Sequence, residues 1–543
     1  MSDDEKDRPG PRGLPRAVLG AVSGVLAGCA ALAVAEFAAV GAGPRSAPVI
    51  AVGGAAVDRT PAVVKDWAIR RFGTDDKLVL QLGILGLLTL LALGLGVLAT
   101  RHRRAGSGGV LFLGAVGALA ATSRPDAAGW ADAVPSAAGA AAGALLLYVL
   151  AGRLEAARPQ GDEGPADPAE PSVDPSGPAP GWDRRGFVAA ASAAAVASAG
   201  AAGAGRWLNG LRGRDAEASR ERVVLPRPGS AAPPVPETAG PPVPGLSPFI
   251  TPNHAFYRVD TALAVPRVDA TAWRLRIHGV GVRRPAVHSF DDLLGRELIE
   301  RNITLTCVSN EVGGPYVGTA RFLGVRLADL LAECGVVPPS RGGPADQLVA
   351  RSVDGMTFGT PVEDVLDGRD AMLAVGMNGE PLPFAHGFPV RMVVPGLYGY
   401  VSACKWIREL ELTTFDAYDP YWVARGWARR APVRTQSRID TPKPFARPRA
   451  GTVLIAGVAW AQRRGIARVE VRVDDGPWRR ARLAAEDTRD TWRQWSLPWR
   501  ATAGRHTLTV RATDRAGQLQ TERRTRTVPD GATGRHSVVV TVE

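Results

Sequence analysis

The sequence has few of the residues that build covalent or metal-bound scaffolds. It contains four cysteines in 543 residues, and none of them forms a C-x-x-C or C-x-x-C-H motif. This spacing excludes a disulfide framework, a simple zinc ribbon and covalently attached haem. The length predicts about three or four structural units.

Histidine is also scarce, and its positions limit what a membrane part could do. None of the seven histidines lies within an apolar segment that is long enough to span a membrane. A haem between membrane helices needs a pair of histidine ligands. We therefore expect the membrane part to be an anchor, with no haem and no iron–sulfur cluster in the protein.

The positive charge is not concentrated. The formal net charge is +12, but the arginines alternate with acidic residues and form no basic stripe with interleaved aromatic residues. A nucleic-acid partner is therefore not expected.

Long apolar segments dominate the first third of the chain. Four candidate spans are Ala17–Val40, Leu78–Thr100, Val110–Thr122 and Ala133–Gly152. The third reaches spanning length only if residues 105–109 join it. Basic residues at 101–104 and 153–158 fall on the same side as the N-terminus, which the positive-inside rule places in the cytoplasm. The loop 41–77 then lies outside, although it carries six basic residues.

Another apolar segment follows a linker that is rich in proline and acidic residues. Arg184 and Arg185, followed by Phe187 and an alanine-rich stretch, resemble a twin-arginine export signal. The alternative is a fifth membrane span with two flanking arginines. Both interpretations place the rest of the chain outside the membrane.

The stretch Asn302–Arg321 carries the strongest chemical signal. Its sequence, NITLTCVSNEVGGPYVGTAR, predicts a β-branched strand that delivers Cys307 to a glycine-rich turn. A thiol held rigidly at a strand end suits a metal ligand or a nucleophile. A buried structural cysteine is the alternative when this residue is considered alone.

Short alternating strands and helices begin at Phe249 and indicate an α+β domain. Five segments of it together resemble the sulfite oxidase family of molybdopterin enzymes, in that family's order and spacing: NHAFYR, TLTCVSNEVGG, GTARFLGVRLADLL, MNGEPLPFAHGFPVRMVVPGLYGY and CKWIRELEL. They cover about residues 249–414. The resemblance implies a membrane-anchored bacterial member, with molybdenum bound to one pterin.

The resemblance also implies roles for individual residues. Cys307 is the single protein ligand to molybdenum, and Tyr316 lines the substrate pocket beside it; we assign both as catalytic candidates. The expected cofactor contacts are Asn253, His254, Tyr257, Asp354, His386, Arg391 and Lys405. A soft thiolate donates charge to a high-valent metal and adjusts its potential.

The chain departs from sulfite oxidases where that family handles its dianionic substrate. Val375 stands where the family has a tyrosine, and Val312 and Pro252 stand where it has arginines. Without these cations a small dianion is poorly attracted. A larger neutral substrate such as a sulfoxide is the alternative, as in the family's extracytoplasmic methionine-sulfoxide-reducing relatives.

After residue 425 the strands recur at short intervals and predict an antiparallel, immunoglobulin-like β-sandwich without a disulfide. This too resembles the family's second domain, which commonly dimerises; a solitary sandwich that covers the catalytic domain is the alternative.

The predicted organisation has seven segments. They are a disordered cytoplasmic tail (1–16), a four-helix membrane region (17–152), a linker (153–182), a fifth span with the twin-arginine-like signal (183–205), a Pro-rich linker (206–248), the molybdopterin-binding catalytic domain (249–425) and the β-sandwich (426–543).

The function that follows is that of a multi-pass bacterial membrane protein with an extracytoplasmic catalytic domain. It would transfer an oxygen atom on a small substrate and exchange electrons with a separate cytochrome or quinone-linked carrier. Two alternatives stay open. One is a cofactor- or partner-binding membrane protein that has lost turnover, and the other is a transporter or sensor, which the scarcity of polar residues in the spans disfavours.

Overall fold

The computed structural model describes residues 16–60, 64, 71, 76–124, 129–155 and 184–543. The predicted tail up to residue 15 and most of the predicted linker, 156–183, lie outside these residues. The described chain divides into two compact units, Met1–Arg212 and Gly213–Glu543.

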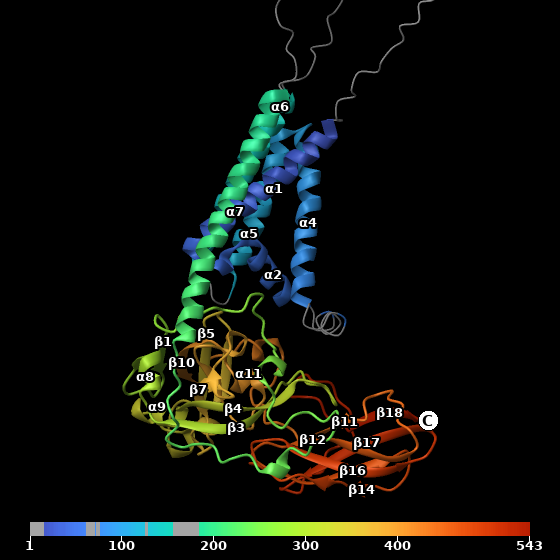
Figure 1. Cartoon of the computed structure of the whole chain (residues 1–543). Coiled ribbons are helices and arrows are strands. Elements are labelled where there is room, and N and C mark those ends of the chain that lie inside the picture. The colour runs from blue at the N-terminus through green and yellow to red at the C-terminus, as the bar shows by residue number, and fades with distance from the viewer. Residues whose placement is uncertain (1–15, 61–63, 65–70, 72–75, 125–128, 156–183) are drawn as a thin grey trace, which may run out of the picture. The chain divides into compact units, whose positions relative to one another are not determined.

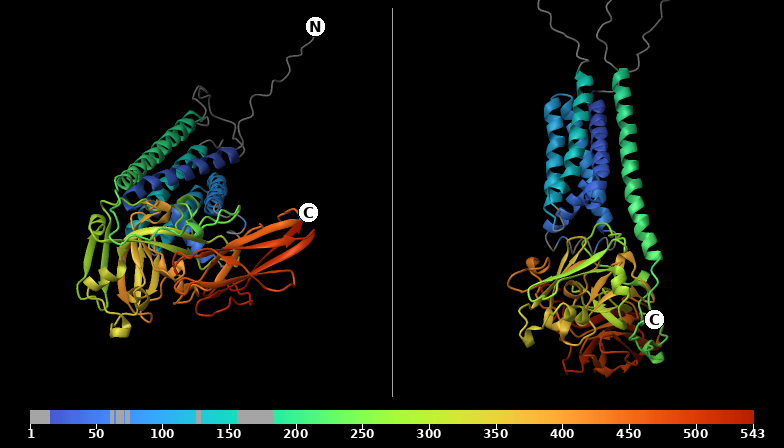
Figure 2. Two further views of the ribbon diagram at one scale, coloured as in Figure 1. Left: turned by 60° about the horizontal axis from the view of Figure 1, so that its bottom comes forward. Right: turned by 90° about the vertical axis from the view of Figure 1, so that its left-hand side faces the viewer.

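The first unit is helical (Figures 1 and 2). Its helices are α1 (Arg16–Ala42), α2 (Pro48–Arg59), α4 (Asp76–Ala99), α5 (Arg103–Thr122), α6 (Val134–Glu155) and the first part of α7 (Arg184–Glu221). Five helices of the described chain, α1, α4, α5, α6 and α7, are long and apolar enough to cross a membrane. This agrees with the five predicted spans.

Small residues allow these helices to approach closely. A Cβ atom added to Gly24 of α1 would lie 1.9 Å from the carbonyl oxygen of Ala92 in α4, and one added to Gly139 of α6 would lie 2.3 Å from that of Ala31 in α1. Membrane helices usually pack with their backbones in van der Waals contact. Lipid is as apolar as the helix surface, so no hydrophobic force drives the helices together and close packing has to do so. The alanine and glycine content of the sequence therefore has a packing role.

Two elements of this unit differ from the prediction. The loop 41–77 contains the helix α2, because Pro48 occupies its first turn and Ala51 is buried against Ala120 and Ala121 of α5. The helix α7 does not end near residue 205 but continues to Glu221, since no proline follows until Pro226. Its 38 residues correspond to roughly 57 Å, longer than a bilayer core of about 30 Å.

The second unit begins with the predicted α+β domain, which contains two mixed or antiparallel sheets (Figure 1). The first has the order β2-β1-β10-β5-β6, and the second has the order β3-β4-β7-β8 with β9 paired to β7. Their strands are β1 (Arg274–Gly279), β2 (Ala286–Ser289), β3 (Leu298–Thr306), β4 (Val317–Arg326), β5 (Gln347–Ser352), β6 (Thr357–Pro361), β7 (Met372–Met377), β8 (Glu380–Pro381), β9 (Arg391–Val393) and β10 (Ile407–Thr413).

Short helices connect these strands. They are α8 (Phe290–Leu294), α9 (Leu327–Glu333), α10 (Val362–Leu366) and α11 (Gly399–Ser402). The helix α8 starts with a capping box between Ser289 and Asp292 and ends at Leu294, with Gly295 as its C-cap. One apolar core, with Phe322, Phe388 and Ile277 at its centre, joins both sheets.

The last part of the chain forms two four-stranded antiparallel sheets, β11-β12-β16-β15 and β14-β13-β17-β18. The strands are β11 (Gln436–Thr441), β12 (Gly451–Trp460), β13 (Ile466–Val473), β14 (Arg479–Arg480), β15 (Arg482–Leu483), β16 (Arg493–Ala501), β17 (Gly504–Asp514) and β18 (His536–Val542). Ile455 and Trp495 of one sheet share a core with Val469, Val510 and Val540 of the other.

The Pro-rich stretch that we expected to be a linker lies against the second unit. Ser230 forms a bridge with Ile299 of β3, and Ala239 is fully buried in the core. The apolar residues between its prolines, such as Leu225 and Val235, pack on that core, which explains why this stretch is not a free spacer.

Candidate active site

The β3–β4 hairpin places Cys307 beside Tyr316. Cys307 follows the last residue of β3, and its amide donates a 3.0 Å hydrogen bond to the carbonyl oxygen of Tyr316, just before β4. The side-chain oxygen of Asn310 accepts a bond from the amide of Tyr316 at 2.8 Å, while the amide of Asn310 donates to the carbonyl of Cys307. Asn310 thus fixes the turn between them. The predicted strand and turn are confirmed here.

The C-terminal sheets hold β3 just before Cys307. Because β3 is an edge strand, its outer backbone groups need partners. The amide of Thr304 donates to the carbonyl of Asp490, and the buried amide group of Gln462 donates to the carbonyl of Thr304 at 2.9 Å. The hydroxyl of Thr304 also accepts a bond from the amide of Trp492. The strand end is therefore clamped from outside the catalytic domain.

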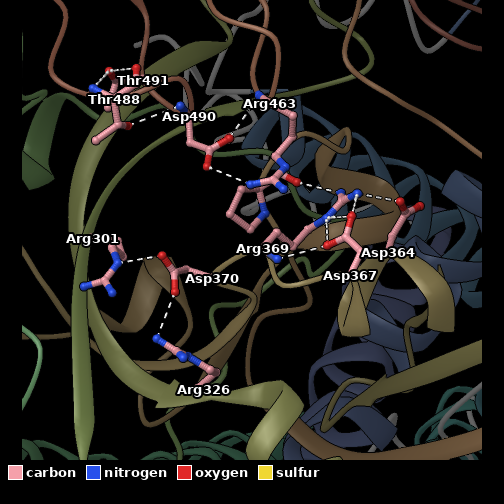
Figure 3. A network of polar contacts seen from close by, with 11 residues as sticks. Arg301, Arg326, Asp364, Asp367, Arg369, Asp370, Arg463, Thr488, Asp490 and Thr491 are labelled. Atoms are coloured by element: carbon pink, nitrogen blue, oxygen red, sulfur yellow. Dashed lines mark hydrogen bonds and ion pairs between the residues drawn. The ribbon is translucent and has the colours of Figure 1, made fainter. Parts of the chain in front are cut away.

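A network of ion pairs surrounds the start of the same strand (Figure 3). Arg301 of β3 and Arg326 of β4 both contact Asp370, at 2.6 and 3.1 Å, and Asp370 lies two residues before β7. This carboxylate links three strands of one sheet. The arginines compensate the charge that Asp370 brings to a partly buried position.

A two-residue hairpin fixes the segment around Asn253. Asn378 and Gly379 join β7 to β8 with positive φ angles of 53° and 85°, as a type I′ turn requires. The side chain of Asn378 donates to the carbonyl of Thr251 and to the side chain of Asn253, and it accepts from the amide of Arg321. The side chain of Asn253 in turn donates to the hairpin, at Met377 and Glu380. Its role here is to position the chain.

His386 and Arg391 form a buried pair. His386 Nε2 lies 3.0 Å from the carbonyl oxygen of Asn253, and Arg391 Nη1 donates to the carbonyl of His386 at 3.2 Å. Burial, with the charge of Arg391, lowers the pKa of His386 to about 4, so this imidazole is neutral at neutral pH. Gly387 is required between them, because a Cβ there would lie 3.0 Å from that of Arg391 and 3.1 Å from Lys405 Cα.

Arg391 is a buried cation with unused hydrogen-bonding capacity. It is 5% exposed, its Nε has no hydrogen-bond partner, and no carboxylate of the described chain pairs with it. Burial lowers the pKa of Arg391 to about 10. A buried, charged guanidinium with an unbonded nitrogen indicates a hydrogen-bond acceptor that comes from outside the polypeptide.

Lys405 is the second buried cation, and it does have a partner. Its Nζ donates to Asp260 at 2.8 Å, and Asp260 also binds Arg258. Burial lowers the pKa of Lys405 to about 8, although the charge of Asp260 opposes this effect. Burial raises the pKa of the Cys307 thiol, while Ser309 and the charge of Lys405 favour its thiolate.

Aromatic side chains belong to the same cluster as Cys307. The rings of Tyr257 and Tyr316 meet edge to face at 6.3 Å, and Phe256 joins Tyr257 to His386 through ring contacts of 5.0 and 5.6 Å. Burial, followed by the charge of Cys307, raises the pKa of Tyr257, so its hydroxyl stays protonated. Among the predicted residues, Cys307, Tyr316, Tyr257, His386, Arg391 and Lys405 therefore gather in one place.

The remaining predicted positions are less central. The side chain of His254 is exposed, and that of Asp354 accepts a bond from the amide of Met356 near the buried Cys404. Val375 is fully buried in the core on β7, Val312 is half-buried, and Pro252 is exposed. Arg258 and Asp260 belong to the site but were not predicted, although Arg258 ends the motif NHAFYR.

Comparisons with known proteins identify the family that this domain resembles. Residues 262–422 match the family described as oxidoreductase molybdopterin binding domain. Mitochondrial sulfite oxidase of Homo sapiens is 30% identical over 303 residues, which are 48% of this chain and 55% of that protein. Sulfite oxidase of Gallus gallus is 30% identical over 327 residues, which are 52% of this chain and 69% of that protein.

The chain belongs to the sulfite oxidase family of molybdopterin-dependent oxidoreductases. It spans about half the length of the mammalian relatives, as the human enzyme shows. The solved structure of the sulfane dehydrogenase SoxCD from Paracoccus pantotrophus is also similar, with 26% identity, a TM-score of 0.47, and coverage of 54% of this chain and 84% of that one.

The residues of the site suit the molybdenum cofactor that this family binds. The thiol of Cys307 lies at a strand end, and the same cluster contains two buried cations, Arg391 with an unpartnered nitrogen and Lys405, whose charge acts on Cys307. An anionic, oxygen-rich group with polar ring edges would accept hydrogen bonds from Arg391. These bonds would replace the bonds to water that the guanidinium loses on burial. The residues that this chain brings together are therefore chemically suited to hold the cofactor.

The turn that carries Cys307 should loosen in acid because of His536. This imidazole accepts a bond from the amide of Ile439 at Nδ1 and packs on Gly313, and burial lowers its pKa to about 4 from an ordinary 6.5. The unfolded chain binds more protons between these values, so His536 stabilises the fold above pH 6.5 and this contribution is lost as the pH falls to about 4. We expect the free energy of unfolding to fall over that range.

Denaturant unfolding of the purified protein between pH 4 and 7.5 measures this loss. His536→Gln should make the acid dependence shallower, while His386 and His288, whose pKa values are also lowered, still contribute in the same direction. His506 is the control, since its bond to Asp474 raises its pKa and its contribution has the opposite sign, present below 6.5 and lost at higher pH. An unchanged acid slope in His536→Gln would contradict the assignment.

Proposed function

We propose that the protein is a membrane-anchored, outward-facing molybdenum oxidoreductase. It transfers an oxygen atom to or from a small sulfur-containing substrate and exchanges electrons with a separate carrier. The observation that carries this proposal is the grouping of Cys307 with Arg391, Lys405 and His386 in a domain of the molybdopterin-binding family.

Each residue has a role that its contacts support. Cys307 binds the metal as a thiolate from the rigid end of β3. Arg391 and Lys405 hold the anionic parts of the cofactor, and the neutral His386 orients Arg391 through its carbonyl oxygen. When bound, the cofactor supplies two-electron oxygen-atom transfer. The protonated Tyr257 and the neighbouring Tyr316 donate hydrogen bonds towards a substrate oxygen and exclude water from one side.

The pocket favours a neutral substrate over sulfite. The rings of Tyr257 and Tyr316 pack against each other beside the turn that carries Cys307, and Val312 contributes no charge to that turn. Neutral hydroxyl donors suit the S=O dipole of a sulfoxide, whereas a dianion gains more from cations. We therefore expect faster reduction of a sulfoxide such as methionine sulfoxide than oxidation of sulfite.

A dye-coupled assay of the purified full-length protein compares the two substrates. The expected ratio of kcat/KM favours the sulfoxide by at least about tenfold, the effect of one lost charged contact. Faster oxidation of sulfite would refute the pocket argument. Turnover of neither substrate by protein that contains molybdenum would favour the alternative of a binding protein without catalysis, which the replacements Val375 and Val312 suggest.

Three features support the position in the membrane. Five helices have the length and composition of spans, basic residues cluster at 101–104, and α7 leads from the helical unit into the catalytic unit. The protein should remain in the pellet after carbonate extraction, and protease added outside intact spheroplasts should digest the catalytic unit. Protection of that unit until lysis would reverse the proposed orientation.

The C-terminal sheets have a role at the active site that dimerisation does not require. We propose that they form an immunoglobulin-like sandwich of residues 426–543 whose main task is to clamp β3 through Thr304. A homodimer through the same domain stays open. Light scattering of the detergent-purified protein distinguishes a monomer from a dimer.

A further inference from the structure

The helical unit contains a cavity that an anchor does not need. Its volume is about 170 Å³, and it lies between α1, α2, α4, α5 and α6. Glycine, alanine, valine and leucine make most of its wall, and none of its lining residues is charged. The polar residues in the wall are Cys29, Thr89 and Ser136. A site with this lining accepts an apolar group.

One hydroxyl group in the wall has no partner. Ser136 is 2% exposed, and its Oγ makes no hydrogen bond with any described residue, whereas Thr89 already donates to the carbonyl of Leu85 at 2.8 Å. A buried hydroxyl without a partner costs about 1–3 kcal/mol in an apolar environment. Ser136 is thus a second, independent sign of a ligand, because a bound acceptor would remove that cost.

The position of Ser136 defines how a ligand would lie. Ser136 is in the first turn of α6, and Gly117 of α5 and Pro48 of α2 lie next to it at the same end of the cavity. The wall continues along α6 to Leu147, a helix rise of about 16 Å. The cavity has room for a ring-sized head with an acceptor oxygen at Ser136. An apolar tail would continue from this head along the wall.

We propose that this cavity binds an isoprenoid quinone. Its neutral ring carries carbonyl oxygens that can accept a bond from Ser136, and its tail matches the apolar wall. A phospholipid fits less well, because no charged residue lines the cavity to meet its headgroup. The inference rests on the proposed membrane position of the enzyme, and it assigns to the anchor the place where a lipid-soluble electron carrier is held.

Cys29 provides a probe of this site. It lines the cavity and is exposed, while the other three cysteines are buried in the second unit. Decylubiquinone should protect Cys29 of the full-length detergent-purified protein from alkylation by N-ethylmaleimide, as read by mass spectrometry. Ser136→Ala should weaken the protection by about fivefold, the effect of one hydrogen bond. Ser107→Ala is the matched control, since Ser107 is also a buried serine with an unpartnered hydroxyl but does not line the cavity.

Several results would overturn the proposal. They are no protection of the wild-type protein, equal weakening in both serine variants, and equal protection by decylbenzene, which would show a site for an alkyl chain only. If Cys29 does not react, quinone extracted per chain replaces this measurement. Gly28→Leu fills the cavity, because a Cβ at Gly28 meets only Ala92, at 3.3 Å. Equal quinone content in the wild type and Gly28→Leu would also contradict the site.

The assay separates this inference from the proposed function. Oxygen-atom transfer coupled to a dye bypasses the natural carrier, so Ser136→Ala should keep the wild-type dye-coupled rate. Loss of quinone binding with full dye-coupled activity would support the cavity assignment. Absence of dye-coupled activity in wild-type protein that binds quinone would contradict the proposed function alone.

Discussion

Cys307→Ser should abolish oxygen-atom transfer, with a fall in kcat/KM of more than about 100-fold. Even residues that only orient metal ligands contribute about 10–100-fold, and a direct ligand should contribute more. Serine keeps nearly the same shape, so the turn held by Asn310 should persist. A hydroxyl at this position is a hard, weakly acidic donor in place of a soft thiolate. Dye-coupled activity and molybdenum content per chain are the measurements.

Cys334→Ser is the matched control for this variant. Cys334 is also buried, at 2% exposure, but it lies at the C-terminal end of α9, and its carbonyl bonds Arg283 and Arg284 through the backbone only. It should keep most of the activity and lose only about 1–2 kcal/mol of stability. Full activity in Cys307→Ser, or equal loss in both variants, would show that the thiol at 307 is structural.

Arg391→Met should have opposite effects on cofactor content and on stability. The lowering of the Arg391 pKa from 12.5 to about 10 means that the folded chain disfavours this charge by roughly 3 kcal/mol. Methionine has a similar length without the charge, so the cofactor-free protein should gain about 1–3 kcal/mol. The same change removes the cation that meets the cofactor, and molybdenum per chain should fall by about 10–100-fold.

Arg369→Met separates these two effects. Arg369 is nearly as buried as Arg391, but it pairs with Asp364 and Asp367 (Figure 3). Its removal should destabilise the protein by about 1–3 kcal/mol, less than for a fully buried pair because both carboxylates are about a third exposed. Molybdenum content should stay near that of the wild type. A loss of stability in Arg391→Met comparable to that in Arg369→Met would contradict the proposed role of Arg391.

The local part of the site could be predicted from the sequence. The β-branched residues before Cys307 predict a strand, and the glycines after it predict a turn. This pattern alone predicts that Cys307 and Tyr316 are neighbours in the hairpin. The turn at Asn378 and Gly379 is equally local. The resemblance to sulfite oxidases added His386 and Arg391, which are distant from Cys307 in sequence but join the same cluster through Phe256 and Tyr257.

Contacts that depend on tertiary packing could not be predicted. Asp260 becomes the partner of Lys405 only because the chain after NHAFYR folds over the segment that follows Cys404. Thr304 is clamped by Asp490 and Gln462, which lie more than 150 residues away and carry no motif. The helix α2 was missed for a related reason, since its burial against α5 stabilises it more than its own short sequence does.

Sulfur coordination of the metal is the property that decides the assignment of Cys307. X-ray absorption at the molybdenum edge counts the sulfur atoms around the metal in purified full-length protein. We predict that Cys307→Ser, loaded with the cofactor, shows one sulfur neighbour fewer than the wild type and one additional light-atom neighbour, while Cys334→Ser shows the wild-type count. An unchanged number of sulfur neighbours in Cys307→Ser would contradict the role of Cys307 as the metal ligand.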